Sequence, residues 1–146
     1  MIKNIVSCAK KTDNFLKKYF NKEIQSPLIN PIKYGTLSGG KKIRSSIIIN
    51  TGKLFNIESK KLLNLCGAVE CIHSYSLIHD DLPCMDNDKI RRGKPSTHIK
   101  YGESTAILAG NSLLTLAFEM IADKKYLINN NLKIELIKEL AFCSGH

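Results

Sequence analysis

The sequence lacks three features, and each absence excludes a class of protein. No stretch alternates polar and apolar residues with the two-residue period of a strand, so an all-α fold is expected. The opening residues Met1–Val6 give way to polar residues almost at once, so neither a secretory signal nor a membrane span is expected. The five cysteines are odd in number and contain no Cys-x-x-Cys pair, which predicts reduced structural thiols in a cytoplasmic protein.

Acidic residues are scarce, since 13 aspartates and glutamates face 22 lysines and arginines and leave a formal charge of +9. A basic chain can bind nucleic acid, but the lysines here are scattered and few aromatic residues stand among them. We therefore expect no nucleic-acid partner. The positive charge instead suits a chain that attracts anionic substrates into a cleft.

Four aspartates lie close together in one segment, and they are Asp80, Asp81, Asp86 and Asp88. Unpaired carboxylates repel one another and are costly to bury, so their density indicates a bound cation. Mg²⁺ fits, because it takes one or two carboxylates and completes its shell with water and phosphate oxygens. Arg91 and Arg92, just downstream, could then hold the same phosphates. The alternative is a solvated loop whose charges form surface pairs worth about 0–1 kcal/mol each.

A buried helix should lead into this acidic segment. Apolar residues recur every three or four positions over 59–82, which predicts a helix there. His73 and Asp80 lie two turns apart and should share a face, whereas Asp86 would be about 120° out of line. Pro83 cannot continue a regular helix, so a bulge that absorbs two residues is expected to return Asp86 to the face of Asp80.

A second cluster of charges lies upstream, where two glycines precede basic residues: Gly39, Gly40, Lys41, Lys42 and Arg44. Paired glycines that open a helix expose amide groups to an anion and let a phosphate approach the backbone. Lys41 and Arg44 should then share one face of a helix. The alternative is a flexible turn before a basic helix surface.

The remaining pattern completes an all-α fold without an internal repeat or an interdomain linker. Connections are expected over 27–38, which can include a short helix, and over 83–103, which carries the functional loop. Helices are expected over 2–22, 39–54, 59–82, 104–123 and 132–143.

These segments together resemble one family, the short-chain trans-polyprenyl diphosphate synthases of the bacterial farnesyl diphosphate synthase type. The resemblance implies the N-terminal half of the isoprenoid synthase fold, with antiparallel helices around a substrate cavity. It also makes a cleaved presequence unexpected, because the similar region begins early. The stretches that carry the resemblance are Gly39–Arg44, Val69–Asp81, Leu82–Asp86, Arg91–Pro95, Tyr101–Glu103 and Ala106–Asn111.

The resemblance implies a role for each charged residue. Asp80 and Asp86, with Asp81 in support, form the catalytic acidic set that binds Mg²⁺ against the diphosphate of an allylic substrate, dimethylallyl or geranyl diphosphate. Arg91 binds that diphosphate directly. For His73, a packed and hydrogen-bonded core histidine is the alternative to a ligand. The residues implied to hold isopentenyl diphosphate are Lys41, Arg44, His73 and Arg92.

The implied reaction is ionisation, condensation and elimination. Cationic groups neutralise the charge on the departing diphosphate, the double bond of isopentenyl diphosphate attacks the allylic cation, and a proton is lost. No nucleophilic serine or cysteine is required. Tyr75, five residues before Asp80, is implied to stop elongation near farnesyl diphosphate, and the alternative is an ordinary core aromatic.

The length of the chain departs from this family, whose members run much further and carry a second aspartate-rich motif. A single partial domain over 1–146 is therefore expected, which would be a fragment, a degraded gene product or one part of a split enzyme. Two functions stay open. One is a prenyltransferase chain completed by a separately encoded C-terminal half or a homodimer partner. The other is a non-catalytic diphosphate-binding or regulatory subunit of a synthase.

Overall fold

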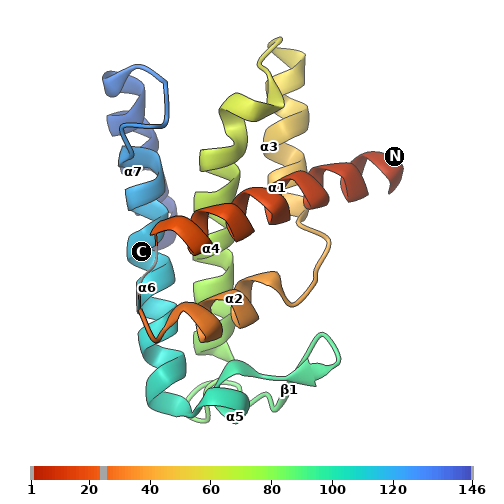
Figure 1. Cartoon of the computed structure of the whole chain (residues 1–146), viewed down its shortest axis with the longest axis vertical. Coiled ribbons are helices and arrows are strands. Elements are labelled where there is room, and N and C mark those ends of the chain that lie inside the picture. The colour runs from red at the N-terminus through yellow and green to blue at the C-terminus, as the bar shows by residue number, and fades with distance from the viewer. Residues whose placement is uncertain (1, 24–25, 146) are drawn as a thin grey trace.

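The computed structural model describes residues 2–23 and 26–145, and over these residues the fold is all-α, as predicted (Figure 1). One short 3₁₀ helix, η1, and one two-stranded hairpin interrupt the α-helices. In chain order the elements are α1 (Ile2–Glu23), α2 (Ile29–Leu37), α3 (Ile43–Leu54), η1 (Ser59–Leu62), α4 (Leu63–Asp80), β1 (Ile90–Arg91), β2 (Lys94–Pro95), α5 (Thr97–Tyr101), α6 (Glu103–Ala122) and α7 (Asn130–Gly145).

Two long helices, α4 and α6, form the centre of the fold and run antiparallel side by side (Figure 1). Gly110 of α6 lies so close to α4 that an added Cβ would come within 2.3 Å of His79 Nε2. By length and composition alone, α6 could cross a membrane, and it is the only such helix in the described part of the chain. Its apolar face is instead packed into the core against α4.

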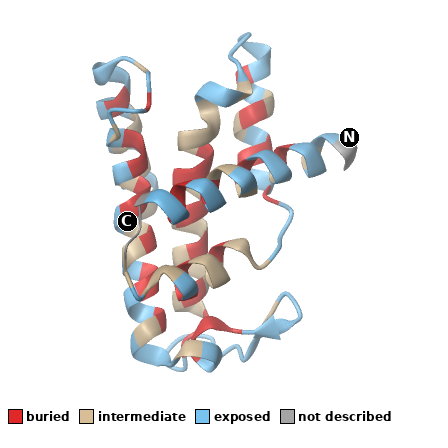
Figure 2. Cartoon of the chain, in the orientation of Figure 1, coloured by how far each residue is buried: buried red, intermediate tan, exposed pale blue. Residues whose placement is uncertain are grey.

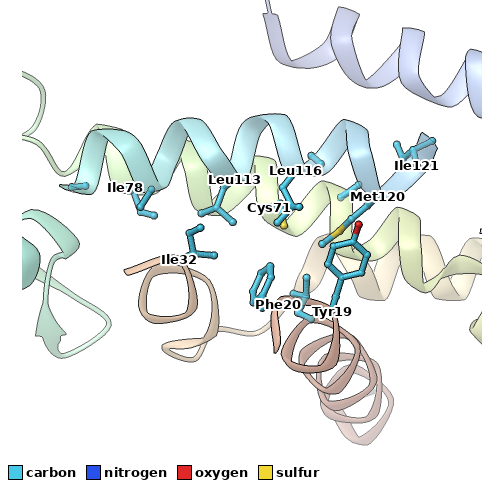
Figure 3. Packing of buried hydrophobic residues seen from close by; sticks show 14 of the residues in the cluster. Tyr19, Phe20, Ile32, Cys71, Ile78, Leu113, Leu116, Met120 and Ile121 are labelled. Carbon is cyan, nitrogen blue, oxygen red and sulfur yellow. The ribbon is translucent and has the colours of Figure 1, made fainter. Parts of the chain in front are cut away.

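The hydrophobic core lies where α1 and α2 meet the α4–α6 pair (Figure 3). Figure 2 shows buried segments along both central helices, whereas the hairpin is exposed. Burying one large apolar side chain typically contributes about 1.5–3 kcal/mol, so this cluster fixes how the helices cross. The largest of its fully buried side chains are Leu16, Phe20, Ile32, Leu113, Met120 and Ile121.

The helix boundaries differ from the prediction before α3. This helix begins at Ile43 rather than at residue 39, because Gly39 and Gly40 have φ values of 96° and 110° and Lys42 has a φ of 47°. Such left-handed conformations cannot continue a helix. Residues 39–42 therefore form a loop, and the expectation that Lys41 and Arg44 share a helix face is wrong.

The region predicted as a functional loop contains more regular structure than expected. β1 pairs antiparallel with β2, with Arg91 opposite Lys94. Tyr34 of α2 anchors this hairpin, because its hydroxyl donates to the Pro95 carbonyl at 2.7 Å. The Tyr34 ring also packs edge-on against Tyr101 of α5, with centroids 5.5 Å apart. These contacts join residues far apart in sequence, so local periodicity could not reveal them.

Candidate diphosphate and metal site

The acidic segment forms a closed turn. α4 stops at Asp80, and the Asp86 N–H then donates to the Asp80 carbonyl at 2.8 Å. The N–H groups of Met85 and Asn87 both donate to the Leu82 carbonyl, at 2.9 and 3.0 Å. The chain thus returns Asp86 to the end of α4, but it does so by ending the helix rather than by the bulge expected at Pro83.

Asp80 and Asp86 are the carboxylates that this turn offers to a metal ion. Asp80 is half-buried and Asp86 is exposed. Across residues 2–23 and 26–145, no three His, Cys, Asp or Glu side chains gather in a group that could hold a metal ion. Mg²⁺ does not need such a group, because one or two carboxylates and phosphate oxygens typically suffice. The donor set therefore fits Mg²⁺ only together with a bound diphosphate.

Asp81 is engaged by Arg91 instead of facing a metal. Its side chain is buried, and Arg91 Nε donates to its two oxygens at 3.0 and 3.2 Å. Arg91 Nη2 also donates to Asp81, and to Asp88 at 3.2 Å. The hydrogen bonds that Arg91 donates to the Asp81 carboxylate raise the pKa of the Arg91 guanidinium. Asp81 therefore fixes the position of Arg91, and its supporting role in metal binding stays a prediction.

Arg92 connects the acidic segment to the glycine loop. Its Nη1 donates to the Gly39 carbonyl, and an added Cβ on Gly40 would lie 2.7 Å from its Cζ atom. Gly40 thus has two reasons to lack a side chain, a φ of 110° and an arginine that crosses its backbone. The prediction that the paired glycines open a helix is therefore wrong, and the glycines instead let the hairpin reach the loop before α3.

The four residues implied to hold isopentenyl diphosphate line a single pocket of about 310 Å³. Lys41 comes from the loop, Arg44 from the first turn of α3, His73 from α4 and Arg92 from the hairpin. Desolvation, followed by the charge of Arg44, lowers the pKa of His73. These four residues therefore bring three basic side chains and an imidazole with a lowered pKa to one pocket, which suits a multiply charged anion.

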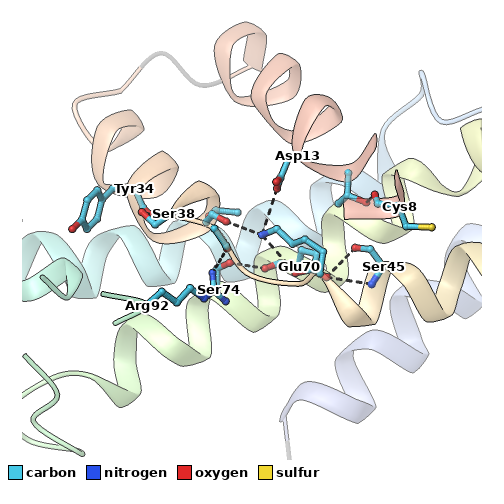
Figure 4. Close-up of polar contacts among 12 residues, drawn as sticks. Cys8, Asp13, Tyr34, Ser38, Ser45, Glu70, Ser74 and Arg92 are labelled. Atoms are coloured by element: carbon cyan, nitrogen blue, oxygen red, sulfur yellow. Dashed lines mark hydrogen bonds and ion pairs between the residues drawn. The ribbon is translucent and has the colours of Figure 1, made fainter. Parts of the chain in front are cut away.

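Sequence reasoning missed a buried charge network, of which Lys42 and Glu70 also line this pocket. Lys42 Nζ donates to the Thr36 carbonyl at 2.7 Å and lies 3.7 Å from a carboxylate oxygen of both Asp13 and Glu70. Glu70 in turn accepts from the N–H and the hydroxyl of Ser45, at 3.2 and 2.9 Å (Figure 4). The sequence did contain one indication of this network, since Glu70 is the only acidic residue between positions 63 and 79. A lone carboxylate on a buried helix requires a partner.

Tyr75 lies half-buried on α4, at the edge of the main core. Its ring packs edge-on against His79, with centroids 4.8 Å apart. His79 is itself held by α6, since its Nε2 lies 3.2 Å from the Ile107 carbonyl. The orientation of Tyr75 thus depends on the α4–α6 contact, and its role in product length stays a prediction.

Three comparisons with known proteins agree with this architecture. The model of the polyprenyl synthetase family matches residues 25–143. The chain is 50% identical over 122 residues to the farnesyl diphosphate synthase of Buchnera aphidicola subsp. Acyrthosiphon pisum (strain APS), which covers 83% of this chain and 43% of that protein. The structure of this chain matches that of a geranyltransferase from Legionella pneumophila with a TM-score of 0.92 and 35% identity, over 97% of this chain and 50% of the Legionella chain.

A further solved structure, an FPP/GFPP synthase from Zymomonas mobilis, matches with a TM-score of 0.88 and 36% identity, over 99% of this chain and 54% of that one. The chain therefore belongs to the polyprenyl synthetase family, and the resemblance inferred from its motifs is confirmed. The chain spans less than half of the Buchnera relative and about half of each solved structure.

Proposed function

We propose that this chain supplies the diphosphate-binding part of a prenyltransferase that condenses an allylic diphosphate with isopentenyl diphosphate, forming farnesyl diphosphate. The observation that carries the proposal is the convergence of Lys41, Arg44, His73 and Arg92 on one pocket. These residues come from segments up to about fifty positions apart, yet all four present groups that bind phosphate. The names of the relatives support the same chemistry.

In this function the basic pocket holds the diphosphate of isopentenyl diphosphate and orients its double bond. Asp80 and Asp86 would hold Mg²⁺, which when bound polarises the allylic diphosphate and neutralises charge on its oxygens. Arg91, fixed by Asp81, donates to the same departing diphosphate. Arginine and lysine side chains thereby stabilise the leaving group in the transition state, and the allylic cation is attacked by the second substrate.

The cysteines take no part in this chemistry. All five are free thiols, and burial raises the pKa of Cys66 to about 12, so it stays protonated and unreactive. Cys71 is shifted in the same direction for the same reason. Unpaired buried thiols accord with a reducing compartment, and a cytoplasmic location is part of the proposal.

The test has a binding arm and a turnover arm. Isopentenyl diphosphate is titrated into the chain by calorimetry, with isopentenyl alcohol as the control ligand that lacks the diphosphate. We expect binding of the diphosphate only, and no binding would refute the proposal. In the turnover arm, the chain is mixed with the C-terminal half of the Buchnera relative, both substrates and Mg²⁺, and released diphosphate is measured. Binding without turnover would identify a non-catalytic diphosphate-binding subunit instead.

A further inference from the structure

The loop that carries Lys41 and leads into the first turn of α3, where Arg44 lies, cannot fix its own conformation. Residues 39–42 include two glycines and three left-handed φ values. Lys42, the residue that precedes the first turn of α3, makes no side-chain hydrogen bond that caps the helix. A loop of this kind gains its order from contacts to other elements, because glycine loses more conformational freedom on folding than any other residue.

Glu70 of α4 supplies those contacts with both of its carboxylate oxygens. Oε1 accepts from the Ser45 N–H at 3.2 Å and from the Ser45 hydroxyl at 2.9 Å, while Oε2 lies 3.7 Å from Lys42 Nζ. One carboxylate therefore holds the residue before α3 and a residue in its first turn. Arg44 lies between these two points, and Lys41 directly precedes them. A negative charge at the N-terminus of α3 also stabilises that helix end.

Lys42 extends the same network to two further helices. Its Nζ donates to the Thr36 carbonyl at the end of α2 and pairs with Asp13 of α1 (Figure 4). The side chains of Lys42 and Glu70 are each only 2% exposed. Removing one partner from such a pair leaves an uncompensated buried charge, so the arrangement has few alternatives.

We propose that Glu70 is a positioning residue for the diphosphate pocket: through Lys42 and Ser45 it holds Lys41 and Arg44 in register with His73. Glu70 and His73 lie three positions apart on α4, so the carboxylate that holds the loop is fixed to the helix that carries the imidazole. The inference rests on the proposed function of the pocket, since it assigns a purpose to groups that surround it.

A simple effect of charge predicts a different result, which makes the inference testable. Glu70 is the only acidic residue that lines the pocket, so removing its charge alone should strengthen the binding of an anion. The double variant Lys42→Met/Glu70→Gln removes one charge of each sign and leaves the net charge of the pocket unchanged. Weaker binding by this variant reports lost positioning.

The experiment measures the Kd of inorganic diphosphate by calorimetry, without a metal ion. We expect the double variant to bind about tenfold more weakly or worse, in line with the loss of charged hydrogen bonds. Lys42→Arg keeps a cation with several donors at this position and should bind within about twofold of the wild type. Rescue by this conservative change would not follow from a purely steric role.

A buried lysine elsewhere provides the matched control. Lys133 of α7 is also buried and donates to a backbone carbonyl at 2.7 Å, that of Asp123. Lys133→Met should lower the melting temperature as the double variant does, yet leave the Kd unchanged. An equal loss of binding in this control would mean that reduced stability, not positioning, weakens the pocket, and would overturn the inference.

The remaining outcomes separate this inference from the proposed function. If the wild type binds diphosphate and the folded double variant binds it equally well, the inference is wrong and the function stands. If the wild type does not bind diphosphate, both the inference and the proposed function are wrong. Should the double variant fail to fold, Ser45→Ala tests the inference instead, because this substitution removes only the hydroxyl donor to Glu70. We expect it to weaken binding about threefold, and an unchanged Kd would overturn the inference.

Discussion

The basic and the acidic parts of the site differ in how they are held. The basic pocket draws Lys41, Arg44, His73 and Arg92 from four elements, and the buried carboxylate of Glu70 forms part of its wall. The acidic turn brings Asp86 to Asp80 through one backbone hydrogen bond and leaves the Asp86 side chain exposed. A buried carboxylate compensates part of the positive charge in the pocket, whereas the proposed partner of the two aspartates is a bound Mg²⁺. The basic pocket is therefore held by side-chain contacts between several elements, whereas the acidic turn is held by its own backbone.

The largest effect is expected when the two carboxylates of the acidic turn, Asp80 and Asp86, are removed. Mg²⁺ with inorganic diphosphate should protect residues 85–94 from hydrogen exchange, because the metal joins the carboxylates to the anion. Asp80→Ala combined with Asp86→Ala should abolish this protection. Asp88→Ala, which removes an exposed carboxylate outside the predicted metal set, is the control and should retain it. Protection that persists in the double variant would end the metal assignment.

The next effect separates the two diphosphate sites. In a chain completed with its C-terminal half, Lys41→Ala or Arg44→Ala should weaken isopentenyl diphosphate, and Arg91→Ala should impair the allylic substrate. Losing a charged hydrogen-bond partner typically costs about 1.5–3 kcal/mol, or roughly ten- to over a hundredfold in affinity. Separate titrations with each substrate measure this, with Lys53→Ala as the control on the same helix as Arg44. Equal effects on both substrates would refute the division.

A smaller effect tests the junction between the loop and the hairpin. Gly39 and Gly40 both have positive φ, so alanine at either position should cost about 1–2 kcal/mol of stability by thermal unfolding. Only at Gly40 would the new Cβ also meet Arg92, since nothing lies within 4 Å of a Cβ at Gly39. Gly40→Ala should therefore also weaken binding of isopentenyl diphosphate. Equal affinities in the two variants would show that the Arg92 contact does not matter for the pocket.

The pH dependence of the basic pocket should be smaller still. The folded-state pKa of His73 lies below its ordinary value of 6.5, so the unfolded chain takes up the proton first as the pH falls below 6.5. The free energy of unfolding should therefore decrease as the pH is lowered through this range. Protonated His73 adds a positive charge, so affinity for diphosphate should rise over the same range. Calorimetric titration with diphosphate on either side of pH 6.5 measures the affinity, and thermal unfolding at the same pH values measures the stability. His73→Gln, which cannot titrate, should lose the part of both pH dependences that comes from His73. An identical pH profile in both proteins would exclude His73 as the source.

The last prediction concerns product length and leaves both diphosphate sites intact. In a completed enzyme, Tyr75→Ala should lengthen the product, because the proposed barrier is steric. Tyr75→Phe keeps a ring of similar size against His79 and should preserve the product. Chromatography of the dephosphorylated products measures chain length. An unchanged product from an active and folded Tyr75→Ala enzyme would make Tyr75 an ordinary core aromatic.

The sequence by itself determined most of the helices and the family of the chain. Apolar residues at helical spacing located α4 and α6 to within a few positions, because the period of a helix is a local property. The clustered aspartates and the glycine–lysine motif indicated Mg²⁺ and diphosphate, because charge density is visible in the sequence. The family followed from the order of these motifs and is confirmed by the comparisons.

Only the tertiary structure decided which charged groups pair with each other. Asp81 holds Arg91, Glu70 holds Lys42, and Arg92 crosses the backbone of Gly40. No spacing rule predicts these partners, because they lie from ten to more than fifty positions apart and meet only when α1, α2 and α4 pack on one core. A buried charge must find a partner to offset its desolvation, and the partner within reach is set by the packing of the helices.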